Sequence, residues 1–298
     1  MIQRFRHIVH LIIAFFSDYL SLLGRPLFYQ LQYQHFRKEI IPKDCDKQLC
    51  ILGNGPSFSL VTDHLDEMKD IDFCAVNLSV NTEVFFRMKP KMYVIVDMGF
   101  WIDKSDERFL QAKKNISKID WDMRIMLPFN CPNSFKKELE RNPFVKVCRY
   151  ANNSWNPELK KANYLKMRLF KNGLVSPDGS NVSISAVYVG LLLGYKQISL
   201  IGTELSWMKD IKVNDKNEVV LVDRHYYGDV EHVWLDYNGN SIKLVDFLGS
   251  QLTTFTGHME LRQFADYLGS RIINRTPGSY IDAYERGKFE ELLNIESL

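Results

Sequence analysis

Short apolar segments recur along the chain between stretches whose apolar residues have helical spacing. They cover residues 49–52, 73–76, 92–96 and 198–201 and are rich in β-branched and other large apolar side chains. Runs of this length are typical of strands that are buried on both faces, and helices between them are typical of βαβ units. The pattern predicts an α/β fold with a mostly parallel, Rossmann-like sheet.

Further elements are predicted beside the last of these strands. Residues 182–193 are small and apolar and end at Gly194, which predicts a buried helix directly before the strand. Residues 211–222 are predicted to form two short strands around a polar turn.

The C-terminal part of the chain has one clear helical pattern. Apolar residues follow i, i+3, i+4 and i+7 spacing over 261–268, which predicts a helix that begins just after Gly257 and His258. Residues 271–274 are predicted to form a further strand.

The same patterns divide the chain into regions. Residues 1–45 are aromatic and predict an N-terminal amphipathic helical arm, and residues 46–298 form the main domain. Within it, residues from about 101 to 175 are charged and aromatic and lack a convincing sheet pattern. This stretch predicts an inserted helical lid region.

The arm contains an apolar run at residues 8–16, which Arg4 and Arg6 precede. The run is too short to span a bilayer, and no small-residue cleavage site follows it, so neither a spanning helix nor a secretory signal is predicted. Two interpretations stay open. The arm lies in a membrane interface with its arginines near anionic headgroups, or it packs on the domain or on a second subunit.

Composition narrows the class of protein. With 298 residues, 46% of them apolar, the chain is long enough for one large α/β domain. The 38 Lys and Arg residues nearly balance the 36 Asp and Glu residues, so no global field marks a protein that binds nucleic acid. The 5 cysteines are an odd number without metal-ligand spacing and indicate reduced thiols in a cytoplasmic protein.

A glycine-rich turn follows the first strand directly, in the sequence Ile-Leu-Gly-Asn-Gly-Pro-Ser at residues 51–57. Gly53 and Gly55 allow a tight bend close to phosphate oxygens, and Pro56 suits the first turn of a helix that Ser57 can cap. Ligands of open parallel sheets bind at this edge. The turn is neither a P-loop nor a full G-x-G-x-x-G motif, so a nucleotide-binding turn and a plain turn both stay open.

Polar residues also follow the other predicted strands. Asn54, Asn77, Asp97 and Glu204 each stand at a carboxyl end. Amide side chains there can bond a ribose, a base edge or a phosphate, and the alternative for both asparagines is stabilisation of a turn. Asp97 is a candidate ligand contact, cap or weak metal contact, but no D-x-D motif suggests a divalent ion.

Two histidines stand out among the 7 in the chain. A helix start after His258 would keep its imidazole neutral and able to accept a proton. His225 adjoins Tyr226 and Tyr227, whose hydroxyls could donate to a phosphate. For each histidine a structural role is the alternative, and the motifs of α/β-hydrolases, kinases and zinc proteases are absent.

Several of these motifs occur in the same order in a known family. The set comprises Gly53–Ser57, Asn77, Ser180-Asn181-Val182 with its helix, Gly202-Thr203-Glu204 and Gly257-His258. Over about residues 48–287 the chain resembles the bacterial sialyltransferases of glycosyltransferase family 42. Segments 202–207, 225–227 and 276–286 resemble still more the related proteins of bacterial surface-polysaccharide clusters.

The resemblance implies a GT-A-like variant of the Rossmann-like fold and a nucleotide-sugar-binding catalytic domain. It implies an inverting transfer that needs no cofactor and no metal, from a CMP-activated sialic acid or related nonulosonate to a surface glycan such as lipopolysaccharide or capsule. Gly53, Asn54, Gly55 and Ser57 would hold the nucleotide, together with Asn77, Asp97, Ser180 or Asn181, and Glu204.

The same resemblance implies that His258 takes the proton of the acceptor hydroxyl. Two positions depart from the family, which has an Asn where Asp97 stands and places a leaving-phosphate tyrosine near Ser206. Tyr226 and Tyr227, beside His225, are the candidate substitutes for that tyrosine.

A lipid-linked glycan acceptor would place the protein in the cytoplasm, peripheral on the inner face of the inner membrane, with the arm as its contact. A homo-oligomer stays open, and no nucleic-acid partner is expected. The alternatives to a glycosyltransferase are a Mg²⁺-dependent pyrophosphokinase-like enzyme, which would need clustered carboxylates, and a non-catalytic scaffold that binds nucleotide sugars.

Overall fold

The computed structural model describes residues 48–293 apart from 69, 103–104, 156–162, 179–180, 226–227 and 237–238. The predicted N-terminal arm, Cys45 and the last five residues lie outside the described part of the chain. No helix within the described ranges is long and apolar enough to cross a membrane.

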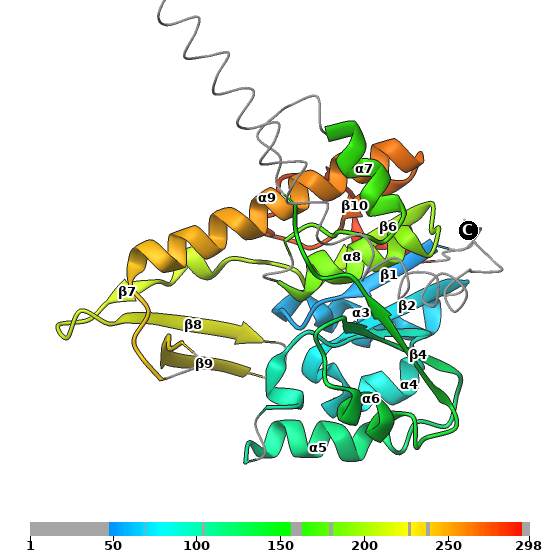
Figure 1. Ribbon diagram of the computed structural model, residues 1–298, viewed down its shortest axis with the longest axis horizontal. Helices are drawn as coiled ribbons and strands as arrows, with labels where there is room; N and C mark the ends of the chain where they lie inside the picture. The colour runs from blue at the N-terminus through cyan, green and yellow to red at the C-terminus, as the bar shows by residue number, and fades with distance from the viewer. Residues whose placement is uncertain are drawn as a thin grey trace, which may run out of the picture.

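The main sheet has eight strands in the order β11-β10-β6-β1-β2-β3-β4-β5, and every neighbouring pair is parallel. The predicted mostly parallel α/β sheet is therefore confirmed (Figure 1). Its strands are β1 (Gln48–Leu52), β2 (Ile71–Val76), β3 (Met92–Val94), β4 (Met123–Pro128), β5 (Val145–Tyr150), β6 (Gln197–Ile201), β10 (Arg271–Asn274) and β11 (Glu285–Arg286).

Helices cover both faces of the sheet. Successive side chains of a strand point to opposite faces, so apolar residues in consecutive positions are buried on both sides. In β1, Leu49 and Ile51 join the apolar core beneath one helical layer, and Cys50 and Leu52 join the core beneath the other. The first layer holds α7 (Asn163–Lys171), α8 (Val182–Leu192) and α9 (Leu244–Leu268). The second holds α3 (Ser59–His64), α4 (Glu83–Met88), α5 (Glu107–Ile116) and α6 (Asn133–Leu139).

Short 3-10 turns follow several strands and begin or end helices. They are η1 (Pro56–Phe58), η2 (Leu65–Glu67), η3 (Asn77–Asn81), η4 (Met98–Phe100), η6 (Trp207–Lys209) and η7 (Phe289–Leu292). η1 starts with proline at its first position, as the sequence predicts.

The prediction of a helical lid at about 101–175 is wrong. This stretch contributes β4 and β5 to the main sheet, and α5 and α6 pack against the same apolar core as the preceding helices. The strands escaped the pattern because charged residues interrupt them: Lys146 is exposed and Arg149 half-buried on the edge strand.

A second, antiparallel sheet projects from the main one and holds β7 (Lys212–Val213), β8 (Val219–His225) and β9 (Gly228–Val233). The predicted hairpin is confirmed by the pairing of β7 with β8. α9 runs from this small sheet to the main layer (Figure 1). Phe247, near the start of α9, packs with Val219 and Leu221 in a core of their own.

The predicted start of this helix is wrong, because α9 begins at Leu244 and His258 lies well inside it. The inward face of its first half buries Phe247, Gln251 and Thr254, a mixture that breaks the apolar spacing seen over 261–268. Sequence periodicity therefore detected only the half that packs on the main sheet.

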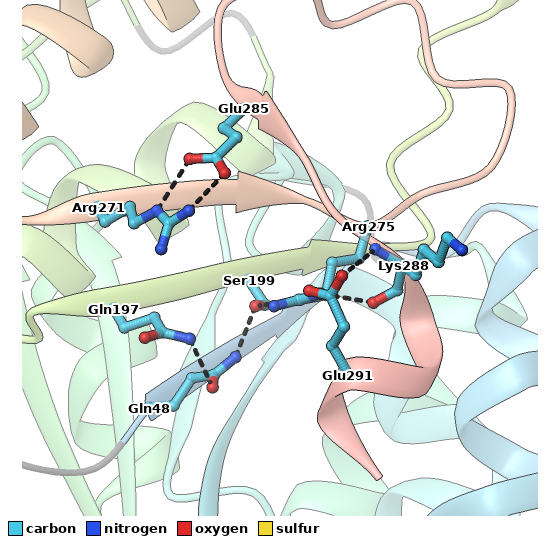
Figure 2. A network of polar contacts seen from close by, with 8 residues as sticks. All are labelled: Gln48, Gln197, Ser199, Arg271, Arg275, Glu285, Lys288 and Glu291. Atoms are coloured by element: carbon cyan, nitrogen blue, oxygen red, sulfur yellow. Dashed lines mark hydrogen bonds and ion pairs between the residues drawn. The ribbon is translucent and has the colours of Figure 1, made fainter.

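The C-terminal segment is fastened to the sheet by the buried guanidinium of Arg275 (Figure 2). Arg275 Nε donates to Ser199 Oγ at 3.0 Å, and Nη1 donates to the carbonyl of Lys288 and pairs with the carboxylate of Glu291. Gln48 Nε2 donates to the same Ser199 oxygen at 2.6 Å. This network joins β1, β6 and β10 to η7.

Four of the five cysteines lie in the described part of the chain. Cys50, Cys74, Cys131 and Cys148 are buried, and none of these four forms a disulfide. Burial raises the pKa of the Cys131 thiol to about 11 and that of Cys50 to about 12, so both are protonated at neutral pH.

Candidate functional site

A pocket lies at the carboxyl edge of the sheet, where the order of strands changes direction. From β1 the chain builds outward through β2 to β5, and it then returns to place β6 on the other side of β1. Ligands of open α/β sheets bind at such a switch point. The pocket is lined by the residues that follow β1, β2 and β6, by the start of α8 and by β8.

Two backbone bends form the floor of this pocket and touch one another. Gly53 N–H donates to the carbonyl of Ile201 at 2.8 Å, and Gly55 N–H donates to that of Gly202 at 2.9 Å. A Cβ on Gly53 would lie 2.0 Å from the carbonyl oxygen of Gly202, which itself has a φ of +71°. The glycines are therefore required by contact between the two bends, and their amides are engaged before any phosphate arrives.

At the helix start of residues 55–57, where phosphate oxygens are considered from the sequence, the structure has a carboxylate of the chain itself. Ser57 N–H donates to Glu204 Oε1 at 2.8 Å, and Ser57 Oγ accepts from Gly202 N–H at 3.1 Å instead of capping the helix. A Cβ on Gly55 would lie 1.7 Å from Glu204 Oε2. That oxygen is buried and has no hydrogen-bond partner among the described residues.

Three predicted asparagines line the pocket, and two are partly engaged. Asn77 Oδ1 accepts from the N–H groups of Val96 and Asp97 at 3.1 and 3.3 Å. Asn181 Oδ1 accepts from Ser183 N–H at 2.8 Å and so caps α8. The side chain of Asn54 makes no hydrogen bond to another described residue. Since the engaged atoms of the first two are their carbonyl oxygens, what they can still offer a ligand is an N–H donor.

Asp97 lies outside the pocket lining. It caps η4 by accepting from Gly99 N–H at 2.9 Å, and burial raises the pKa of its carboxyl group. β3 ends two strands away from β1 in the sheet, which explains why its end does not reach the switch point.

His258 is fully buried, with 0% of its surface exposed, in the wall behind the pocket. Its Nε2 lies 3.1 Å from Ser183 Oγ, and its Nδ1 lies 2.8 Å from the hydroxyl of Tyr284. α9 lies close to α8 and to the segment before it at Gly257, where a Cβ would lie 2.8 Å from Ile184 Cδ1 and 3.2 Å from the carbonyl oxygen of Asp178.

This environment corrects the prediction for His258. The sequence predicts an imidazole that a helix start keeps neutral and that faces the cleft as a proton acceptor. Burial lowers the pKa of His258 to about 3, so the ring is neutral for a different reason and takes up a proton only in strong acid. Burial also raises the pKa of Tyr284 well above its ordinary value, which keeps the phenol protonated. The ring reaches the pocket only through Ser183, which lines it.

The small antiparallel sheet also contributes to the lining, through Val222, Arg224 and His225 of β8. Arg224 Nε pairs with Asp210 at 2.8 Å and Arg224 Nη1 with Asp229 at 2.9 Å. The charge of this arginine is therefore already neutralised by two carboxylates. Predicted residues His225 and Glu204 are titratable side chains that also line the pocket.

Three predicted site residues, Ser180, Tyr226 and Tyr227, lie outside the described residues. Sequence reasoning missed Ser183, Arg224 and Tyr284. The one available signal was the Asn-x-Ser pattern at residues 181–183, which is typical of a helix cap and its first turn. Nothing in the sequence relates Tyr284 to residue 258.

No protein-family model matches the chain, and no similar protein was found among curated proteins. Among solved structures the chain is similar to the sialyltransferase CstII from Campylobacter jejuni, described in complex with a substrate analogue, cytidine-5'-monophosphate. The similarity covers 85% of this chain and 88% of that chain, at 16% identity and a TM-score of 0.43.

Proposed function

We propose that the protein is an inverting glycosyltransferase that needs no metal. It transfers a sialic acid or related nonulosonate from a CMP-activated donor to a surface glycan such as lipopolysaccharide or capsule. The observation that carries this proposal is the pocket at the switch point between β1 and β6, which asparagine side chains line. The proposed reaction and donor follow from the motifs that occur in the same order as in glycosyltransferase family 42.

The polar groups of the pocket suit a nucleoside monophosphate better than a diphosphate. Asn77 and Asn181 retain N–H donors, and the arginine among the described lining residues, Arg224, already pairs with Asp210 and Asp229. A phosphodiester carries one negative charge, which neutral donors can stabilise, whereas a diphosphate asks for additional positive charge. A CMP-sugar has a single phosphate.

Inverting transfer also needs a group that accepts the proton of the acceptor hydroxyl. Among the described residues that line the pocket, Glu204 and His225 can do so, because Asp210 is held by Arg224. The candidate base is therefore moved from His258 to these two side chains. Glu204→Gln and His225→Gln separate them: the variant that lowers kcat and flattens the acidic limb of the pH–rate profile removes the base.

The test of the donor is a thermal-unfolding panel with CMP, CDP, UDP, GDP and ADP, each with and without Mg²⁺. A ligand that binds only the native state raises the melting temperature, and we expect the largest rise with CMP, independent of Mg²⁺. Asn54→Ala should abolish that rise. Asn152→Ala is the matched control, because Asn152 is exposed and, among the described residues, its side chain bonds that of Asn130.

The other outcomes reject the proposal in distinct ways. A rise that requires Mg²⁺ and an adenine nucleotide favours the pyrophosphokinase-like alternative. CMP binding without release of CMP from CMP-N-acetylneuraminate, in the presence of glycan acceptors, favours the scaffold. No rise with any nucleotide contradicts both the donor and the site.

We place the arm, residues 1–45, at the inner face of the inner membrane, where a lipid-linked acceptor would meet the cytoplasmic enzyme. Deleting residues 1–40 should then reduce transfer to a lipid-linked acceptor at least tenfold more than transfer to a soluble analogue. Equal losses with both acceptors would contradict this placement and leave the donor proposal standing.

A further inference from the structure

The hydrogen bonds around His258 have only one consistent direction. Asn181 Oδ1 is an acceptor, because it receives Ser183 N–H at 2.8 Å, so the contact of Ser183 Oγ with the same oxygen at 2.6 Å must use the hydroxyl proton. Ser183 has no second proton. The contact at 3.1 Å between Ser183 Oγ and His258 Nε2 therefore requires a proton on Nε2.

The rest of the chain of bonds follows from the same count. A neutral imidazole with its proton on Nε2 has a bare Nδ1, which accepts from the Tyr284 hydroxyl at 2.8 Å. The direction is thus Tyr284 to His258 to Ser183 to Asn181, and the helix cap at Asn181 fixes it. The four side chains come from three parts of the chain: Tyr284 from the segment after β10, His258 from α9, and Ser183 and Asn181 from the start of α8.

This arrangement leaves Ser183 with one unused lone pair and no proton to give. His258, Tyr284 and Ser183 are 0%, 4% and 3% exposed, so bulk water does not rearrange the bonds. Of the three, Ser183 lines the pocket.

We propose that Tyr284 and His258 are positioning residues that hold the Ser183 hydroxyl as a hydrogen-bond acceptor, so that the pocket selects a ligand that presents a hydroxyl or amino donor there. The inference about selection rests on the proposed function of the pocket. The inference about the direction of the bonds does not. An anionic oxygen of a phosphate would find no donor at Ser183 and is directed instead to the asparagine amides.

The first experiment reads the proton directly, by ¹⁵N NMR of the imidazole rings in the full chain at pH 7. The His258 signals are assigned by their loss in His258→Gln. The expected result is a neutral ring with its proton on Nε2. A proton on Nδ1, or on both nitrogens, would overturn the assigned direction whatever the pocket binds.

The second experiment uses binding of CMP by titration calorimetry. Ser183→Ala should weaken CMP about tenfold, the value of one neutral hydrogen bond, whereas Ser185→Ala on the same buried helix should not. 2′-Deoxy-CMP and 3′-deoxy-CMP each lack one hydroxyl donor of CMP, and UMP has a carbonyl oxygen in place of the 4-amino donor. For one of these three ligands the Ser183→Ala penalty should disappear, and a penalty that persists with all three contradicts the selection.

Variants of His258 and Tyr284 distinguish an effect of hydrogen-bond direction on CMP binding from an effect of side-chain packing. Glutamine at 258 can still donate to Ser183 and leucine cannot, so His258→Gln should keep CMP affinity within about threefold and His258→Leu should lose about tenfold. Tyr284→Phe should add no further loss to His258→Leu, because Tyr284 acts only through the ring. Additive losses, or equal losses in Gln and Leu variants that stay folded by circular dichroism, would overturn the positioning role.

If wild-type protein binds none of the nucleotides, the proposed function fails, and the NMR result still decides the direction of the bonds.

Discussion

Two buried polar networks hold the C-terminal segment of this chain, and they differ in charge. The first centres on the guanidinium of Arg275 at the edge of the sheet, which pairs with Glu291 and bonds a serine and a carbonyl (Figure 2). The second joins Tyr284, His258 and Ser183 behind the pocket and contains no charged group at neutral pH.

The difference shows what each kind of network can do. A buried charge is costly unless all its partners are present, so loss of any partner of Arg275 destabilises the fold. The role of the Arg275 network is to hold the C-terminal segment on the sheet. The neutral chain has a direction, because Tyr284 donates to His258 and His258 donates to Ser183. Such a chain of hydrogen bonds can determine whether a side chain at a binding site acts as a donor or as an acceptor. The Arg275 network does not have this effect.

The largest effect is expected where the charged network is removed. Arg275→Met should lower the free energy of unfolding by about 3 kcal/mol, because Ser199 and the Lys288 carbonyl lose a buried donor. The measurement is urea denaturation at pH 7. The control Arg271→Met removes an exposed pair with Glu285 and should cost less than about 1 kcal/mol. Equal costs would mean that burial is not what distinguishes the two arginines.

Acid should weaken the neutral network first. The folded pKa of His258, about 3, lies below its unfolded value of 6.5. Between these values the unfolded chain binds more protons, so stability is lost as the pH falls below 6.5, by roughly 1 kcal/mol per pH unit. Urea denaturation of wild type and His258→Gln at pH 7, 6 and 5 measures this slope. The variant should lack it, and parallel slopes would contradict the burial of the ring.

A smaller effect is expected for one hydrogen bond within the neutral network. Tyr284→Phe leaves His258 Nδ1 buried without its donor and should cost about 1 kcal/mol in the same denaturation assay at pH 7. Tyr280→Phe is the control, because Tyr280 is 41% exposed. A cost no larger than that of the control would place the Tyr284 hydroxyl outside the network.

The smallest effect is expected for the exposed member of the charged network. Arg275 lowers the pKa of Glu291 below its ordinary 4.5. A carboxyl group with a depressed pKa contributes stability above its unfolded pKa and loses it as the pH falls through the folded value. Wild type should therefore lose more stability than Glu291→Gln between pH 5 and 3. Since the Glu291 side chain is 54% exposed, this loss should be the mildest of the four, and a loss that begins above pH 5 would point to another group.

The strands at the centre of the sheet could be predicted from the sequence because burial on both faces leaves an almost unbroken apolar run. β1, β2, β3 and β6 were found in this way. β4 and β5 were not found, because Arg124, Lys146 and Arg149 interrupt their apolar runs. These strands lie near the edge of the sheet, where charged side chains can reach water.

The candidate site was predictable as far as strand ends define it. Asn54, Asn77 and Glu204 line the pocket because the carboxyl ends of β1, β2 and β6 meet there. The roles of the glycines and of His258 could not be predicted, since they depend on contacts between bends and helices far apart in the chain. Gly53 meets Gly202, and His258 meets Ser183.

One unbroken helix spans both sheets. Phe247 in the small core and His258 behind the pocket are eleven residues apart on α9, close to three turns at about 3.6 residues each, so both point inward. Inserting a single residue between them would rotate one relative to the other by about 100°. The length of this interval is therefore as constrained as the identity of either side chain, although no residue within it needs to touch a substrate.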